Sequence, residues 1–274
     1  MPMPGARLGA ISVTCYSWTV MQWEVAPMAK ARARVVKEVP LPVKPAFKRE
    51  FIDFERGIRM GGLAPEERIT QIVKAALVER HRRDFIIDKW GRGRFWQWIC
   101  WLCRDDREAK PLSSKYNFGC VKFFVSYDSK PNVFQAGMQL ERATVARGAP
   151  TEVALQDDWD WHRFVKGLRK GSPLAAELER VVVKEDFTAH LGGVEGDAGT
   201  FRGKAWGGVT AIRRALAKVP DADWAWFQLL WAWPEAEIKE MDGGEIVASV
   251  LAVFDEVAPV MNLIMDGPYL KSRV

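Results

Sequence analysis

The segments CVKFFVSYD (120–128), SKPN (129–132) and VFQAGMQLE (133–141) decide the fold. Apolar and polar residues alternate in the first and third segments, which is the period of a β-strand with one buried face. The middle segment combines Ser, Pro and Asn, which favour a turn. The sequence therefore predicts an antiparallel hairpin. Its apolar face consists of Phe123, Val125, Tyr127, Phe134, Ala136, Met138 and Leu140.

Helical patterns surround this hairpin. Apolar residues recur every three or four positions in 47–58, 65–83, 157–171, 173–182, 209–216 and 245–257, and Pro259 is expected to end the last helix. The run 95–103 is apolar except for Gln97, which predicts a helix buried nearly all round. The Trp-Ala-Trp repeats of 224–233 favour a strand. We predict an α+β fold, with helices packed on a mostly antiparallel sheet around a tryptophan-rich core.

Composition divides the chain into three parts. Residues 1–27 are uncharged from Gly9 to Trp23 and precede a start-like Met28, so we interpret them as a non-native or unstructured extension. Residues 28–46 are basic and contain three prolines, which predicts an extended arm. Residues 47–274 are expected to form one domain. No stretch has the roughly 18–20 consecutive apolar residues that span a membrane.

Charge is distributed unevenly along the chain, although the net charge is only +5. Residues 28–49 carry seven Lys and Arg against one Glu, and residues 80–122 carry eleven against five acids. Residues 215–274 carry four against ten. A basic surface attracts nucleic acid or an acidic partner, although many basic stretches are only solvated. The four cysteines are typical of reduced thiols in a cytoplasmic protein.

The thirteen tryptophans favour a bulky core. Four pairs are spaced two residues apart: Trp96/Trp98, Trp159/Trp161, Trp224/Trp226 and Trp231/Trp233. Trp161 belongs to a predicted helix stripe, which turns Trp159 away from the core. Trp90 begins the run Trp90-Gly-Arg-Gly-Arg94, whose glycines leave the indole and the arginines mobile and exposed. Trp90 and Trp159 are therefore the indoles expected to meet a ligand.

Two short motifs resemble ligand sites without completing them. Cys100-x-x-Cys103 with Cys120 is part of a zinc pattern, but a structural zinc needs four ligands. The run 198–205 (AGTFRGKA) resembles a phosphate-binding loop, but alanine replaces the hydroxyl that would hold magnesium. Lys204 at a helix start remains a candidate anion ligand. The sequence identifies no cofactor.

Carboxylates near a histidine suggest a metal-dependent hydrolase or nuclease. Divalent metals prefer carboxylate oxygens, and a bound metal can activate water. Only this alternative would require a divalent metal. The candidate catalytic residues are Asp128, Glu141, Asp158, Asp160 and His162. The competing interpretation makes Asp157 and Asp158 helix caps, and Glu141 with Arg142 an exposed strand end.

Basic residues alternating with aromatic ones suggest a different function. Cations hold the backbone of single-stranded nucleic acid, and aromatic rings stack on its bases. The candidate ligand-binding residues are Arg82, Arg83, Trp90, Arg92, Arg94, Trp159 and Lys204. We therefore expect a binding or accessory protein that contacts nucleic acid or an acidic protein through its basic N-terminal half, with the hydrolase as the alternative. The sequence predicts no oligomeric state.

Overall fold

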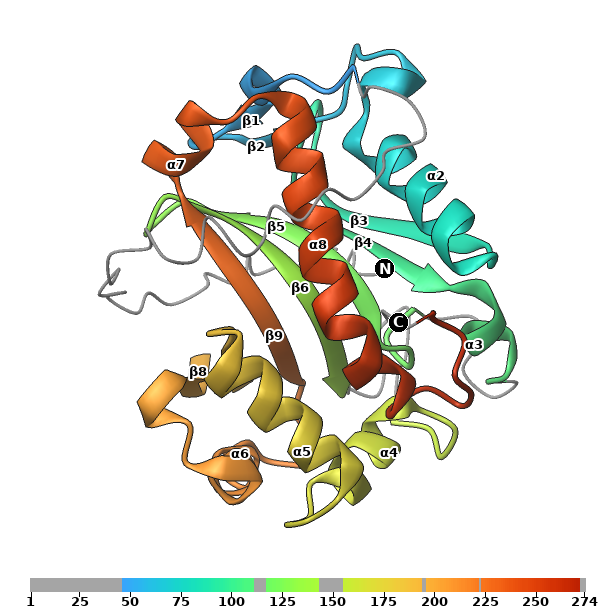
Figure 1. The fold of residues 1–274 in the computed structure, drawn as a ribbon, viewed down its shortest axis with the longest axis vertical. Coiled ribbons are helices and arrows are strands. Elements are labelled where there is room, and N and C mark those ends of the chain that lie inside the picture. Colours follow the sequence, from blue (N-terminus) through green and yellow to red (C-terminus); the bar gives the residue numbers. More distant parts are fainter. Residues whose placement is uncertain (1–45, 111–116, 143–154, 194–195, 222, 272–274) are drawn as a thin grey trace, which may run out of the picture.

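The computed structural model describes residues 46–110, 117–142, 155–193, 196–221 and 223–271 (Figure 1). The predicted extension 1–27 and nearly all of the predicted arm 28–46 lie outside these residues. The predicted hairpin is confirmed, as strands β5 (Lys122–Asp128) and β6 (Val133–Arg142). The segment around the Trp-Ala-Trp repeats forms strand β9 (Ala225–Pro234), which pairs with β6 over ten residues.

The sheet extends outward from these three strands in the order β1-β2-β4-β5-β6-β9-β7-β8, and β3 pairs with the other edge of β4. Every ladder between the described strands is antiparallel. The remaining strands are β1 (Ile52–Asp53), β2 (Gly57–Arg59), β3 (Phe85–Arg92), β4 (Phe95–Cys103), β7 (Thr188–Gly193) and β8 (Gly196–Arg202).

The helices pack on one face of this sheet, as the α+β prediction requires. The α-helices are α2 (Ile69–His81), α3 (Arg104–Glu108), α4 (Asp160–Gly167), α5 (Pro173–Glu179), α6 (Gly208–Leu216), α7 (Glu235–Glu240) and α8 (Gly243–Asn262). Short turns of other helix types are η2 (Arg49–Phe51), η3 (Pro65–Glu67), η4 (Arg180–Lys184) and η5 (Gly203–Ala205). Helix α8 crosses the sheet (Figure 1). Its Phe254 stacks on Phe123 of β5 with ring centres 4.6 Å apart. None of the described helices is long and apolar enough to cross a membrane.

The predicted helix over 95–103 is wrong, because this run forms strand β4. Its apolar residues are shared between the two faces of the sheet: Trp101 contacts Phe254 on the helix-covered face, and Cys100 and Leu102 are buried on the other face. A strand buried on both faces has no alternation, so its sequence resembles that of a buried helix.

Three further predictions about elements need correction. Residues 47–58 form η2, β1 and the start of β2 instead of a helix, because Asp53 caps a turn and Gly57 has a φ of +106°. The run 198–205, which resembles a phosphate-binding loop, forms most of strand β8 and the turn η5 instead. Helix α8 continues past Pro259 to Asn262.

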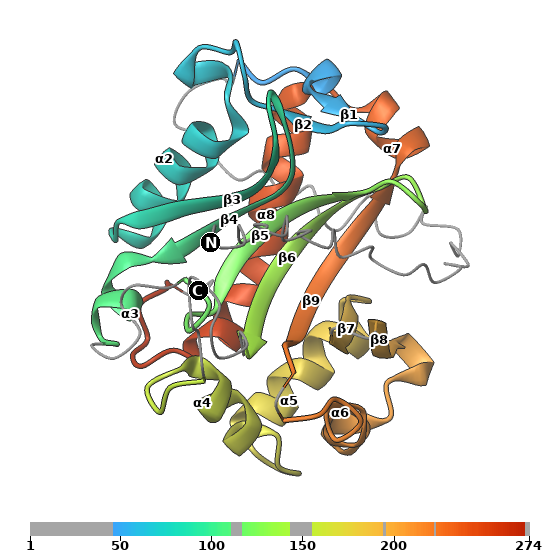
Figure 2. The ribbon, with the colours of Figure 1, turned by 180° about the vertical axis from the view of Figure 1, so that it is seen from behind.

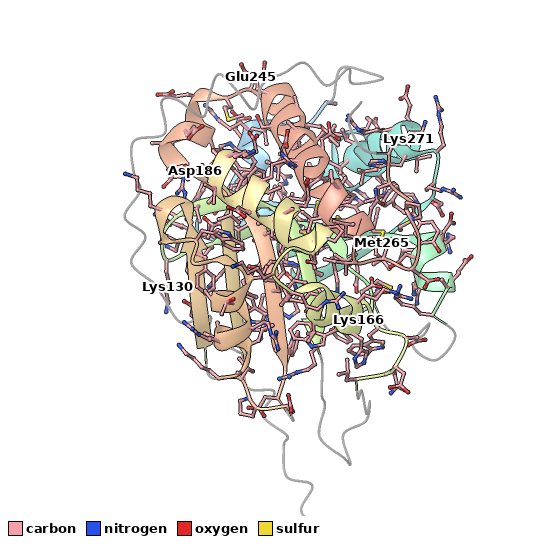
Figure 3. The ribbon with its side chains drawn as sticks, turned by 60° about the horizontal axis from the view of Figure 1, so that its bottom comes forward. Lys130, Lys166, Asp186, Glu245, Met265 and Lys271 are labelled. Carbon is pink, nitrogen blue, oxygen red and sulfur yellow. The ribbon has the colours of Figure 1, made fainter. Side chains whose placement is uncertain are left out.

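The basic end of α2 is explained by contacts within the protein. Arg80 pairs with the buried carboxylate of Asp255 at 2.6 Å. His81 is 3% exposed, and its Nδ1 accepts a hydrogen bond from the backbone N–H of Lys271. Lys271 is labelled in Figure 3. Burial lowers the pKa of His81 from 6.5 to about 4, and the charges of Arg80 and Lys271 act in the same direction. His81 is therefore neutral in the folded protein at neutral pH.

We expect the lowered pKa of His81 to make the protein less stable in mild acid. Between pH 6.5 and about 4 the unfolded chain binds a proton that the folded histidine does not. The free energy of unfolding therefore falls as pH falls through this window, by at most about 3 kcal/mol. His81→Asn keeps an acceptor for Lys271 but does not titrate. The stability difference between wild type and variant, measured by urea unfolding, should shrink from pH 7 to pH 4. If the free energies of unfolding of the two proteins changed in parallel with pH, the lowered pKa of His81 would be contradicted.

Candidate functional site

The sheet face opposite α8 carries polar side chains from β6. Figure 2 shows no described helix in front of β3, β4 and β5 on this side. We call this sheet face the polar face. Gln135, Gln139 and Glu141 of β6 point to it, because their neighbours Phe134, Ala136, Met138 and Leu140 face the helices. Gln139 and Glu141 are each 4% exposed, so the centre of the face is buried.

A hydrogen-bonded network occupies the centre of the polar face. Gln139 Oε1 accepts bonds from the indole N–H of Trp98 at 3.1 Å and from Gln228 Nε2 at 2.8 Å. Lys122, which is 1% exposed, forms an ion pair with Glu141. Burial alone would lower the pKa of Lys122, but the charge of Glu141 outweighs it and the pKa is raised. Lys122 is therefore a fixed cation at neutral pH.

Aromatic and basic side chains gather around the turn between the end of β3 and the start of β4. We call this group the hairpin tip, and it consists of Lys89, Trp90, Arg92, Arg94, Phe95 and Trp96. Trp90 is 55% exposed, more than any other large hydrophobic side chain in the described part of the chain. An indole in this position presents a flat apolar surface to solvent that nothing described in the protein covers.

Cations surround the aromatic rings of the hairpin tip. Lys89 Nζ lies 3.6 Å from the centre of the Trp96 ring, and the guanidinium carbon of Arg56 lies 4.4 Å from that of Phe95. Arg56 is neutralised by Asp53, with Nε and Oδ2 2.7 Å apart. In contrast, neither Lys89 nor Arg94 forms an ion pair with a described carboxylate. The tip therefore combines the cations of Lys89 and Arg94 with the exposed ring of Trp90.

A bulge in the β3–β4 ladder sends neighbouring tryptophans to opposite faces. Trp90 is in register with Trp98, but the next residue, Gly91, is in register with Trp96, so Gln97 is extra. A side chain on Gly91 would collide with the Trp96 backbone at 2.4 Å. Trp96 consequently packs against the helix-side core, while Trp98 packs on the polar face. Both indoles are partly exposed, whereas the sequence predicted that they are core.

The remaining basic candidates do not join the hairpin tip. Arg82 and Arg83 precede β3, whereas Trp90 lies near its other end, about 20 Å away along the strand. Arg83 pairs with Asp105 at 2.7 Å. Lys204 is exposed in η5, next to β8 at the opposite edge of the sheet. The predicted basic and aromatic constellation is therefore divided, and only Trp90, Arg92 and Arg94 lie together.

Trp159 is a correction. We expected its indole to face solvent, but it is fully buried, and its ring packs against Gly119. The expectation treated Trp159 as part of a helix, whereas it precedes the first residue of α4 in extended conformation. It is therefore a core residue and offers no stacking surface to a ligand.

The five candidate catalytic residues do not form a metal site. In the part of the chain that the structure describes, no three His, Cys, Asp or Glu side chains gather to hold a metal ion. Glu141 pairs with Lys122, Asp128 accepts a bond in the β5–β6 turn, and His162 is exposed on α4. Asp158 is half-buried just before α4. Cys100, Cys103 and Cys120 are free and buried, and burial raises the pKa of each thiol.

Asp160 belongs to a buried ionic cluster that the sequence did not predict. Lys110 Nζ lies 2.6 Å from Asp106 Oδ1 and 3.0 Å from Asp160 Oδ1, and all three side chains are at most 1% exposed. Asp160 Oδ2 also accepts the backbone N–H of Val121 at 2.8 Å. Burial raises the pKa of Asp160, and the nearby charge of Asp106 raises it further. The cluster joins α3, α4 and the residue before β5, so its role is structural.

Comparison with known proteins finds no matching family model, no matching curated protein and no matching solved structure. The candidate site therefore depends on geometry alone. Sequence reasoning missed Arg56 as part of it, and it placed Lys89 and Trp98 in the basic and aromatic stretch without selecting them as ligand-binding residues. The two-residue spacing of Trp96 and Trp98, together with the Trp-Gly-Arg-Gly-Arg turn (90–94), was the signal that could have revealed the hairpin.

Proposed function

We propose that this protein binds single-stranded nucleic acid through the hairpin tip. The observation that carries the proposal is Trp90, 55% exposed and flanked in sequence by Lys89 and Arg92. Stacking on an aromatic ring contributes about 1–3 kcal/mol per base, and cations hold the phosphates. The three buried free thiols suit the cytoplasmic location that we propose for this activity.

An acidic protein is the weaker candidate partner for this surface. Cations alone would serve to bind carboxylates, but the tip also presents aromatic rings, with Lys89 and Arg56 stacked on two of them. Bases offer flat surfaces to such rings, whereas acidic side chains do not. The metal-dependent alternative gains no support, because Glu141 and Asp160 are engaged in buried ion pairs.

Two variants should weaken binding of a fluorescein-labelled dT12 oligonucleotide in different ways. Trp90→Ala should raise the Kd about 5- to 150-fold without changing its salt dependence, because it removes stacking. Arg92→Ala with Arg94→Ala should reduce the slope of log K against log salt by about 1.4, because two phosphate contacts are lost. Fluorescence anisotropy between 50 and 300 mM salt measures both quantities.

The matched control for the arginine variant is Arg213→Ala with Arg214→Ala, which removes two exposed cations from α6. This control should leave both the Kd and the salt slope unchanged. If the two double variants lost equal affinity for dT12, the effect would come from the net charge of the protein and not from contacts at the hairpin tip. An absence of dT12 binding by the wild type at 50 mM salt would overturn the proposal.

A further inference from the structure

One row of side chains leads from the hairpin tip across the polar face. The register pairs Trp90 with Trp98, Trp98 with Ser126, Ser126 with Gln135, and Gln135 with Ala232. Side chains in register on antiparallel strands point to the same face. These five residues therefore form a continuous line over β3, β4, β5, β6 and β9.

This row is accessible in part, although the centre of the face is buried. Trp98, Ser126 and Ala232 are partly exposed, whereas Gln135 is buried, with 7% of its surface exposed beside Ser126. Figure 2 shows no described helix in front of β3, β4 and β5. A chain that contacts Trp90 can consequently continue over Trp98 to Ser126.

Trp98 is held in a fixed orientation. Its indole N–H donates to Gln139 Oε1 at 3.1 Å, and the Lys122 ammonium lies 5.8 Å from its ring centre. Gln139 is itself bonded to Gln228, so the acceptor is held from both sides. A ring fixed in this way loses little conformational entropy when a base stacks on it.

Beyond the second indole, the row offers hydrogen-bonding groups. Ser126 Oγ donates to Gln135 Oε1 at 3.0 Å, which leaves the Gln135 amide nitrogen without a partner among the described residues. That nitrogen is a donor, and the Ser126 oxygen retains lone pairs that accept. A donor beside an acceptor complements the edge of a nucleobase.

We propose that the row Trp90–Trp98–Ser126–Gln135 is a track for single-stranded nucleic acid, with bases stacked on the two indoles and one base edge read by Ser126 and Gln135. The inference depends on the proposed function, and it adds base selectivity to it. Three register steps of about 4.8 Å span about 14 Å. Sheets of four strands bind two or three bases in a comparable manner.

Photocrosslinking of the full chain tests the track. Oligonucleotides dT12 and U12 with one 5-bromouracil are irradiated with the protein, and the crosslinked residues are mapped by mass spectrometry. Crosslinks at both Trp90 and Trp98 are expected. The oligonucleotide with the higher crosslink yield identifies the bound nucleic acid as DNA or RNA. Crosslinks confined to residues 89–96 would overturn the track and leave the proposed function intact. No binding of either oligonucleotide would overturn both.

Two variants test the stacking and reading roles separately. Trp98→Leu should raise the Kd for dT12 about tenfold or more, whereas Trp206→Leu, which alters a buried indole of the helix-side core, should not. For the wild type, we expect the Kd values of the four homopolymers to differ by about tenfold between the tightest and the weakest. In Gln135→Leu this difference in Kd should fall to within about twofold. A Gln135→Leu protein with the wild-type preference would overturn base reading.

Discussion

Lys110→Met is expected to lower the free energy of unfolding by about 3–5 kcal/mol. The Lys110 ammonium lies between two fully buried carboxylates, those of Asp106 and Asp160. Burial alone would lower the pKa of Lys110, but the charges of Asp160 and Asp106 raise it, so the lysine is charged at neutral pH. Methionine fills nearly the same volume without the charge. It leaves two buried carboxylates facing each other, and Arg163 at the edge of the cluster is the only remaining described ion-pair partner of Asp160.

Urea unfolding followed by tryptophan fluorescence measures this loss. The matched control is Lys74→Met, which breaks a partly exposed pair with Asp84 at 2.9 Å and should cost less than about 1 kcal/mol. Combining Lys110→Met with Asp160→Asn should recover part of the loss, because the amide oxygen still accepts the Val121 N–H. A Lys110→Met protein no less stable than Lys74→Met would show that the cluster contributes little.

The loss of unfolding free energy caused by Lys110→Met should be smaller at acidic pH than at neutral pH. Protonation of either carboxyl removes the repulsion that the variant exposes. Asp160 already has a raised pKa in the wild type because of its burial and of Asp106. A carboxyl with a raised folded-state pKa destabilises the protein above that pKa, and the penalty disappears as pH falls through it. The difference between the two proteins should therefore narrow below neutral pH.

The hairpin of β5 and β6 was predictable because its two faces differ in polarity. Strand β9 was predictable from its two-residue repeats. Strand β4 was not, because both of its faces are buried and its apolar run has no period. Because the sequence of β4 was interpreted as a helix, its partner strand β3 was not predicted either. The hairpin tip could therefore not be assembled, although Trp90, Arg92 and Arg94 were identified individually.

Polar side chains were harder to place than apolar ones. Alternation assigned Lys122, Gln139 and Glu141 to the polar face, but it could not show that these side chains bond to one another and are buried. Asp160 was proposed as a catalytic carboxylate, yet its partner Lys110 lies fifty residues away in the sequence. Contacts over such separations come from the tertiary fold and leave no local pattern.

Substitutions in the ion pair of Lys122 and Glu141 should lower the free energy of unfolding as much as Lys110→Met does. Here, however, removing both charges together should restore stability. Lys122→Met and Glu141→Met each leave one buried charge without its partner and should each cost about 3–5 kcal/mol. The double variant leaves no charge and should be more stable than either single variant, because apolar pairs of similar volume replace buried ion pairs well. The corresponding cycle for the exposed pair Arg202–Asp186 should give a coupling below about 1 kcal/mol.

The double methionine variant also separates structure from binding. The Lys122 ammonium lies 5.7 Å from the Phe118 ring and 5.8 Å from the Trp98 ring, and the side chain is 1% exposed. A cation enclosed in this way has no access to a phosphate, so it supports the network around Trp98 without touching a ligand. We therefore expect the double variant to bind dT12 with a salt slope equal to that of the wild type, in contrast to Arg92→Ala with Arg94→Ala. A reduced slope would show that Lys122 contacts phosphate and that the polar face opens more widely when nucleic acid binds.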